Sequence, residues 1–336
     1  MMTNKFNNAE TYRTAPFNTA REFVPRYSVF ASQPNEIFFM EPYARVPYEK
    51  VLQNYQNGEM SEFDIKVLSL IATFACAGMT TKALQILLSM MGEDVYSDQT
   101  RLSTALYHLS KNGLISWGRF KSLDRPAAAL FRMIRLTYNG YKFGKLLGIV
   151  TRFNPVEVLD AANAKTRLQL TTLVTQFLKH LPYDVEEFDI RPLYSKRMED
   201  PDAVVRPYAR IRVFGEDMFV EIVRSGTEDY LVWLTDKLRR YTRVFEQLPN
   251  LVINGESEEH NRLIHAYLTE HCAEHGFPLD NMHYTHDLAL FGNAFRSCLY
   301  VFGENGDKIC FTFPETEGIG NELTDTGSAD VTSLVS

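Results

Sequence analysis

The stretch between Ser97 and Leu147 restricts the possible folds of this chain more than any other. Ser97 predicts the start of a helix, because its hydroxyl can accept hydrogen bonds from the free amides of a first helical turn. Apolar residues at helical spacing follow, and Asn112–Gly113 supplies the left-handed residue that ends such a helix. We expect two short strands and a further helix, capped by Thr137, to follow over residues 114–120, 131–136 and 137–144.

Two more helices are predicted just upstream. Ser61 and Asp64 form a capping box before an apolar run that ends at Gly78. A second helix begins at Thr80 or Thr81 and stops at Gly92. Three helices followed by a β-hairpin are the elements of a winged helix-turn-helix domain. The sequence LTYNG at residues 136–140, one hairpin after LSKNGLI, resembles the L-T-x-x-G close of many bacterial winged-helix regulators.

Length and composition set the class of protein. With 336 residues and a hydrophobic fraction of 45%, the chain is long enough for two folded domains. It contains no apolar run of membrane-spanning length and no apolar segment at its N-terminus. The four cysteines are scattered, without a C-x-x-C pair, which indicates reduced thiols. We therefore expect a cytoplasmic protein without membrane contact.

The charge of the chain is divided unevenly. Residues 95–150 contain nine basic residues against two acidic ones, a net charge of +7, although the whole chain carries −7. The remainder therefore carries −14. This asymmetry predicts a basic face on an otherwise acidic protein and favours a nucleic-acid partner for the predicted winged helix.

The winged-helix interpretation assigns candidate DNA contacts. The third helix of such a domain enters the major groove, and the hairpin contacts the backbone or the minor groove. The candidates on these elements are Gln99, Thr100, Arg101, Ser103, Thr104, Tyr107, Lys111, Trp117, Arg119, Lys121 and Arg125. The alternatives are a merely solvated polar face and a winged helix that binds protein.

A second domain is predicted over residues 160–313, with elements in the order α-β-β-β-α-β-α-β. This order resembles the restriction-endonuclease-like core, and a winged helix followed by such a core resembles the replication-relaxation family of plasmids and integrative elements. The expected fold class is α+β, a winged helix-turn-helix at residues 56–150 followed by this α/β domain. Residues 1–55 are expected to be largely unstructured, and residues 314–336 to form a disordered acidic tail.

An active nuclease of that fold would need carboxylates for Mg²⁺ and a lysine near the attacking water. The candidates are Asp202 and Glu221, but Val223 occupies the lysine position and Arg224 is a poor general base. If Pro207–Tyr208 is the matching pair, tyrosine replaces the metal-binding aspartate. We therefore expect an inactive domain without a metal or cofactor.

Other catalytic motifs have little support. His271–His275 reads H-x-x-E-H, the pattern of inverted zinc metalloproteases, but it sits at a helix end beside Gly276. The chain has no Walker A loop, dinucleotide fingerprint or nucleophile elbow. The sequence thus favours a double-stranded DNA-binding protein that acts in replication, transfer or transcriptional regulation of a mobile element. Candidate partners besides DNA are a second copy of the chain and a replication or relaxase protein; the alternatives are a Mg²⁺-dependent nuclease and a protein-binding adaptor.

Overall fold

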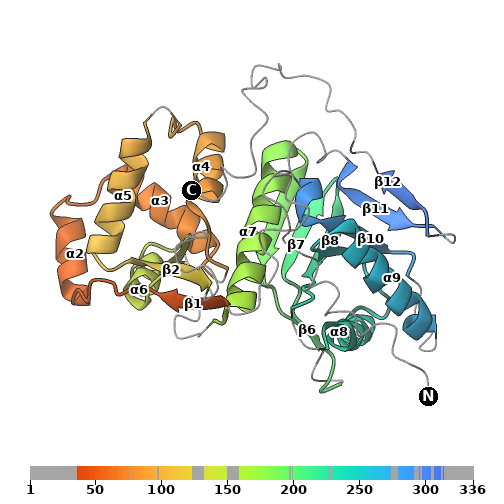
Figure 1. Cartoon of the computed structure of the whole chain (residues 1–336). Helices are drawn as coiled ribbons and strands as arrows, with labels where there is room; N and C mark the ends of the chain where they lie inside the picture. The colour runs from red at the N-terminus through yellow and green to blue at the C-terminus, as the bar shows by residue number, and fades with distance from the viewer. Residues whose placement is uncertain are drawn as a thin grey trace. The chain divides into compact units, whose positions relative to one another are not determined.

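The computed structural model describes residues 36–313 except 76, 97, 123–131, 150–158, 197, 199, 227–228, 274–278, 291–294, 296, 304–305 and 312. Helices and a mixed sheet give an α+β protein, as expected. The chain divides into two compact units (Figure 1). We call residues 33–183 the first unit and the described residues from 184 onward the second unit. None of the described helices is both long and apolar enough to cross a membrane.

The first unit is built from six helices and three strands among its described residues. The helices are α2 (Tyr48–Gln56), α3 (Glu62–Thr73), α4 (Thr81–Met90), α5 (Gln99–Lys111), α6 (Tyr138–Leu146) and α7 (Ala161–His180). The strands are β1 (Glu36–Met40), β2 (Ile115–Ser122) and β3 (Arg132–Leu136).

The helix starts of the first unit follow from capping side chains. The predicted capping box is confirmed: the Asp64 amide donates to Ser61 Oγ at 3.1 Å, and the Ser61 amide donates to Asp64 Oδ2 at 2.8 Å. Thr80 caps α4, and Thr137 caps α6. The prediction for α5 was wrong by one residue, because Asp98 caps this helix through the amide of Arg101.

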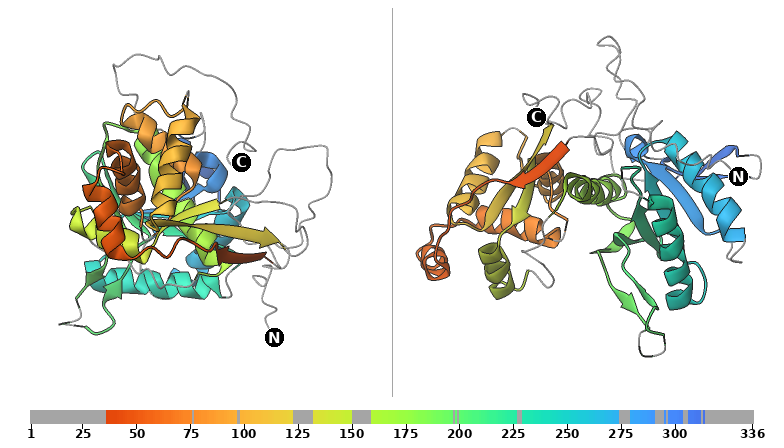
Figure 2. Two further views of the ribbon diagram at one scale, coloured as in Figure 1. Left: turned by 90° about the vertical axis from the view of Figure 1, so that its left-hand side faces the viewer. Right: turned by 60° about the horizontal axis from the view of Figure 1, so that its bottom comes forward.

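The sheet of the first unit has the order β1-β2-β3, with both pairs antiparallel (Figure 2, right). β2 is the central strand, and β1 pairs with its distal half from Gly118 to Ser122. The expectation that residues 1–55 are largely unstructured was therefore wrong for β1 and α2, while residues 1–35 lie outside the described part. Tail residues 314–336 also lie outside it.

Helix α7 belongs to the first unit, although the sequence placed its residues at the start of the second domain. Its Thr171 hydroxyl donates to the carbonyl oxygen of Gly78 at 2.5 Å, just before α4. Its Lys165 ammonium forms a buried ion pair of 2.5 Å with Glu36 on β1. These two polar contacts attach α7 to β1 and to the region before α4. Apolar periodicity along α7 does not predict them.

The second unit is a seven-stranded mixed sheet with helices between its central strands. The sheet has the order β12-β11-β10-β9-β8-β7-β4, in which β8, β9 and β10 run parallel and the outer pairs run antiparallel. The strands are β4 (Val185–Ile190), β7 (Ala209–Val213), β8 (Glu216–Ile222), β9 (Leu251–Gly255), β10 (Met282–His286), β11 (Leu299–Phe302) and β12 (Lys308–Phe311). A small separate hairpin consists of β5 (Tyr194–Ser195) and β6 (Val204–Val205).

Two helices cover one face of this sheet. Helix α8 (Tyr230–Phe245) connects β8 to β9, and α9 (Glu258–Ala273) connects β9 to β10 (Figure 1). A short 3₁₀ helix, η1 (Asp287–Leu290), follows β10. The core between helices and sheet contains Phe219, Leu234, Leu238, Tyr241 and Tyr284 among others. The apolar face of α8 is thus the buried one. Because β8, β9 and β10 run parallel, their carboxyl ends lie at the same edge of the sheet.

Candidate nucleic-acid interface and the polar sites of the second unit

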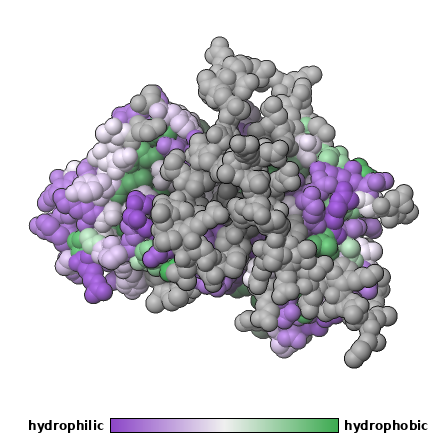
Figure 3. Space-filling view, viewed as in Figure 1, coloured by the Kyte–Doolittle hydropathy of each residue, from purple (hydrophilic) through white to green (hydrophobic). Residues whose placement is uncertain are grey.

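Helix α5 presents a polar face on an apolar anchor. Leu102, Ala105, Leu106 and Leu109 are buried, as the helical spacing predicted. The opposite face is exposed and consists of Thr100, Ser103, Thr104, Tyr107 and Lys111. Tyr107 is 63% exposed, which is a large fraction for an aromatic side chain. The space-filling view shows mainly hydrophilic and neutral residues on the side where α2 and α5 lie (Figure 3).

Two of the predicted contacts on α5 stand apart from this face. Arg101 is exposed, but its guanidinium bonds Glu93 at 2.8 Å and stacks over the Phe63 ring at 3.9 Å. These contacts hold Arg101 against its own unit, so it is a weaker candidate for a DNA contact than Lys111. Gln99 opens the helix, and its side chain lies outside the described residues.

The hairpin candidates share one face of the three-stranded sheet. Trp117, Arg119 and Lys121 alternate along β2 and therefore point to the same side. The cross-strand register adds Phe39, opposite Arg119 on β1, and Arg132, opposite Arg119 on β3. We call this surface, completed by Ile37 opposite Lys121, the wing face. Arg125 lies outside the described residues.

Charge on the wing face is mostly positive. Lys121 and Arg132 are exposed, and the Arg132 guanidinium lies 5.8 Å from the centre of the Trp117 ring. Arg119 forms an ion pair with Glu41, the residue that follows β1. Ile37 and Phe39 are both more than two-fifths exposed beside these cations. The place of β1 next to β2 depends on long-range pairing that no local pattern encodes.

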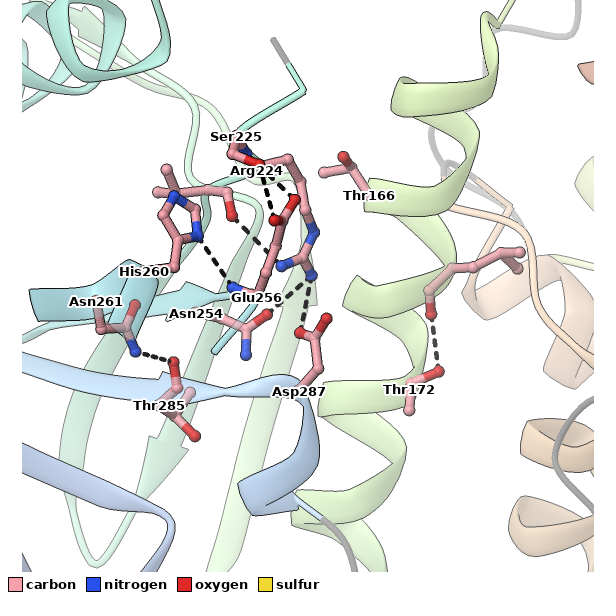
Figure 4. Close-up of polar contacts among 12 residues, drawn as sticks. Thr166, Thr172, Arg224, Ser225, Asn254, Glu256, His260, Asn261, Thr285 and Asp287 are labelled. Atoms are coloured by element: carbon pink, nitrogen blue, oxygen red, sulfur yellow. Dashed lines mark hydrogen bonds and ion pairs between the residues drawn. The ribbon is translucent and has the colours of Figure 1, made fainter. Parts of the chain in front are cut away.

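A second polar site lies at the carboxyl ends of β8, β9 and β10 (Figure 4). The Arg224 guanidinium donates to Asp287 at 2.9 Å and to Asn254 at 3.1 Å. Both charged side chains are almost fully buried, at 2% and 3% exposed. Open sheets commonly bind ligands at this edge. In this protein, Arg224, Asn254 and Asp287 bond to one another at this edge, and these contacts link the ends of the strands.

Glu256 and His260 continue this network. The Ser225 amide and hydroxyl donate to the Glu256 carboxylate at 3.2 and 2.8 Å. The Glu256 amide donates to Nδ1 of His260 at 3.1 Å, which makes that nitrogen an acceptor. Burial, and secondarily the charge of Arg224, lowers the pKa of His260 to about 3. His260 is therefore neutral at physiological pH and does not serve as a proton carrier there.

The two candidate nuclease carboxylates have different surroundings. Glu221 is fully buried, and its carboxylate accepts from Lys237 Nζ at 2.5 Å and from the Tyr241 hydroxyl at 2.6 Å. Asp202 is exposed and pairs with Arg243 at 3.3 Å. Burial raises the pKa of Glu221, and the ion pair with Lys237 opposes that shift. We call Glu221, Lys237 and Tyr241 the buried triad. Sequence reasoning missed it because Lys237 comes from α8 and not from β8.

The H-x-x-E-H motif is described in part. His271 lies near the end of α9, where its Nδ1 is 2.9 Å from the Tyr267 carbonyl oxygen, and Glu274 and His275 lie outside the described residues. Among the residues that the structure describes, no group of three or more His, Cys, Asp or Glu side chains could hold a metal ion.

No protein-family model, curated protein or solved structure matches this chain.

Proposed function

We propose that the protein binds double-stranded DNA, with the first unit acting as a winged helix-turn-helix. In this proposal α5 is the recognition helix and the hairpin of β2 and β3 is the wing. The main supporting observation is the two-sided character of α5. Its apolar residues are buried, while a row of hydrogen-bonding side chains of suitable length for base edges and phosphates faces outward.

The wing face supports the same proposal. Lys121 and Arg132 are exposed cations on neighbouring strands, and the phosphate backbone is the ligand that such a surface attracts. Residues 95–150 carry a net charge of +7 in a chain of net charge −7, so the basic excess falls on these elements. A merely solvated surface would not require cations to be concentrated there.

The second unit has a supporting role in this proposal. We place it as an inactive restriction-endonuclease-like domain that supplies dimerisation, further DNA contact or docking of a replication or relaxase protein. The engagement of Glu221 by Lys237 and Tyr241 supports a non-catalytic role for that carboxylate. Action on a plasmid or integrative element rests on the sequence resemblance, and a cytoplasmic location rests on the scattered cysteines.

The proposal is tested on the full-length chain, because β1 and α7 both belong to the first unit and a fragment of residues 55–150 would lose them. Binding to labelled mixed-sequence duplex DNA is followed by fluorescence anisotropy at low salt. We expect binding, and we expect the double substitution Thr104→Ala/Tyr107→Ala to flatten the sequence preference found by selection from a random pool.

Lys50→Ala is the matched surface control. Lys50 is an exposed residue of α2 that hydrogen-bonds within its own helix, to Gln53 at 3.5 Å. We expect this variant to retain wild-type affinity and preference. Absence of DNA binding at low salt by a folded wild-type chain would contradict the proposal and favour the adaptor alternative.

A further inference from the structure

The three-stranded sheet of the first unit has one covered face and one open face. On the covered face, the ring centres of Phe38 and Phe120 lie 4.9 Å apart, and the ammonium of Lys165 from α7 lies 5.9 Å from the centre of the Phe120 ring. Side chains alternate along a strand, so Ile37 and Phe39 of β1 point to the opposite side, which is the wing face. Ile37 is 44% exposed and Phe39 is 42% exposed. Two large apolar side chains of one strand are therefore open to solvent.

Aromatic rings lie on neighbouring strands of the wing face. Phe39 is paired with Arg119, and Trp117 comes two residues before Arg119 on β2. Phe39 and Trp117 are therefore diagonal neighbours, at a Cα separation of about 7–8 Å. Trp117 is partly exposed. Bases of an unpaired strand stack on such rings whatever their sequence, because every base has a flat π face.

Cations flank these rings. Lys121 and Arg132 are exposed, and neither forms an ion pair with an acidic side chain among the residues that the structure describes. The Arg132 guanidinium lies 5.8 Å from the centre of the Trp117 ring, and Lys121 is paired with Ile37. Apolar rings beside cations suit a ligand that has flat bases and a negatively charged backbone. A second copy of the same face would bring like charges together, which disfavours self-association through it.

The width of the wing face distinguishes a single strand from a duplex. Neighbouring strands of a sheet are spaced about 4.8 Å apart, so β1 and β3, on either side of β2, are about 10 Å apart. The minor groove of a duplex is only about 6 Å wide and cannot admit three strands side by side. In a duplex, moreover, the faces of the bases are covered by neighbouring bases. A duplex can offer phosphates to the cations of this face, but it cannot stack a base on Phe39.

We propose that the wing face binds single-stranded nucleic acid. Bases stack on Phe39 and Trp117, and Ile37 extends the apolar surface beside them. Lys121 and Arg132 bind the phosphates of the strand. This function rests on the same cations as the duplex binding proposed above, but it adds a second form of ligand and does not require a duplex to bind α5.

The test uses the full-length chain and its own fluorescence. The chain contains two tryptophans, so Trp233→Phe leaves Trp117 as the sole tryptophan reporter on the wing face. Labelled oligothymidylate, labelled oligouridylate of the same length and a labelled blunt duplex of mixed sequence are titrated separately by anisotropy, and Trp117 emission is recorded with the unlabelled strands. We expect saturable binding of oligothymidylate with quenching of Trp117. The tighter-binding single strand identifies DNA or RNA as the source.

Variants of Phe39 decide whether stacking contributes. We expect Phe39→Ala to weaken binding of oligothymidylate about tenfold and binding of the duplex by less than about threefold, because only the single strand loses a stacked base. Phe39→Tyr keeps an aromatic ring and should bind oligothymidylate within about threefold of the wild type. Circular dichroism checks that both variants are folded.

Leu146→Ala is the matched control. Leu146 is an apolar residue of α6 that is 61% exposed, so its removal changes the apolar surface of the first unit at a position outside the wing face. We expect this variant to change the affinity for either ligand by less than about twofold. A loss of oligothymidylate binding as large as that in Phe39→Ala would overturn the proposal, because it would indicate unspecific apolar contact.

Two further results would overturn the proposal. One is wild-type affinity of Phe39→Ala for oligothymidylate. The other is a folded wild-type chain that binds neither single strand; if that chain still binds the duplex, the function proposed above stands without this one. Binding of oligothymidylate without binding of the duplex would contradict the function proposed above and support single-strand binding by the wing face.

Discussion

The two units differ in how exposed their positively charged side chains are. In the first unit, Lys111, Lys121 and Arg132 are exposed on α5 and the wing face. In the second unit, Arg224 is buried and Lys237 is 12% exposed, and each is bonded to a buried carboxylate. Exposed cations add little to folding stability and remain available to a partner. Buried ion pairs are part of the folded structure, because removal of one member leaves a buried charge on the other without a partner.

This contrast predicts where a lost charge affects stability and where it affects binding. Arg224→Ala should lower the free energy of unfolding by about 3–5 kcal/mol, because Asp287 and Asn254 lose their buried cationic partner. Urea denaturation followed by circular dichroism measures the change. The double variant Arg224→Met/Asp287→Leu should recover part of the loss, and a single variant as stable as the wild type would break the comparison.

Acid should weaken the second unit through His260. The pKa of His260 is about 3 in the folded protein, so the unfolded chain, with an ordinary pKa of about 6.5, takes up the proton first as the pH falls. Stability from this residue is complete above pH ~6.5 and is lost progressively down to about 3, with a loss of about 2 kcal/mol between pH 7 and 5.

The control for this effect is His260→Asn, whose side-chain oxygen can replace Nδ1 as the acceptor from the Glu256 amide. Urea titrations of both proteins at pH 7 and pH 5 should show a smaller pH dependence in the variant by about 2 kcal/mol. An identical pH dependence in the two proteins would show that His260 does not titrate in this way.

A smaller effect is expected on the wing face, where Arg119 pairs with Glu41. Glu41→Gln removes the acidic group and releases the guanidinium, so duplex affinity should rise by about threefold while stability changes by less than about 1 kcal/mol. Anisotropy and urea denaturation provide the two values. Unchanged affinity would mean that Arg119 does not face the DNA, and Glu49→Gln, on α2, serves as the control for general charge.

Local signals in the sequence predicted much of the fold. Ser61 with Asp64, Thr80 and Thr137 each marked a helix start correctly, because capping depends on residues within one turn. These elements need no information from distant parts of the chain.

The remaining parts of the fold and of the sites could not be predicted, because they depend on long-range contacts. β1 joins the sheet through pairing with residues about 80 positions later, and the pairing brings Phe39 beside Arg119. The exposed side of α5 and the β2 residues of the wing face could be predicted from the sequence, whereas the place of Ile37 and Phe39 on the wing face could not. Glu221 was identified as a functional candidate, but its partners Lys237 and Tyr241 come from the following helix. Which polar groups meet at a sheet edge depends on strand order, which local patterns do not fix.

The salt dependence of DNA binding tests the central claim most directly. Anisotropy of the full-length chain on a labelled duplex is measured from low to moderate salt, for the wild type and for Arg119→Ala/Lys121→Ala. The account predicts salt-sensitive binding, and a logarithmic salt slope smaller by about one to two in the double variant, because Lys121 is exposed while the charge of Arg119 is partly balanced by Glu41. A double variant with the same slope and affinity as the wild type would contradict the claim that the wing face binds DNA.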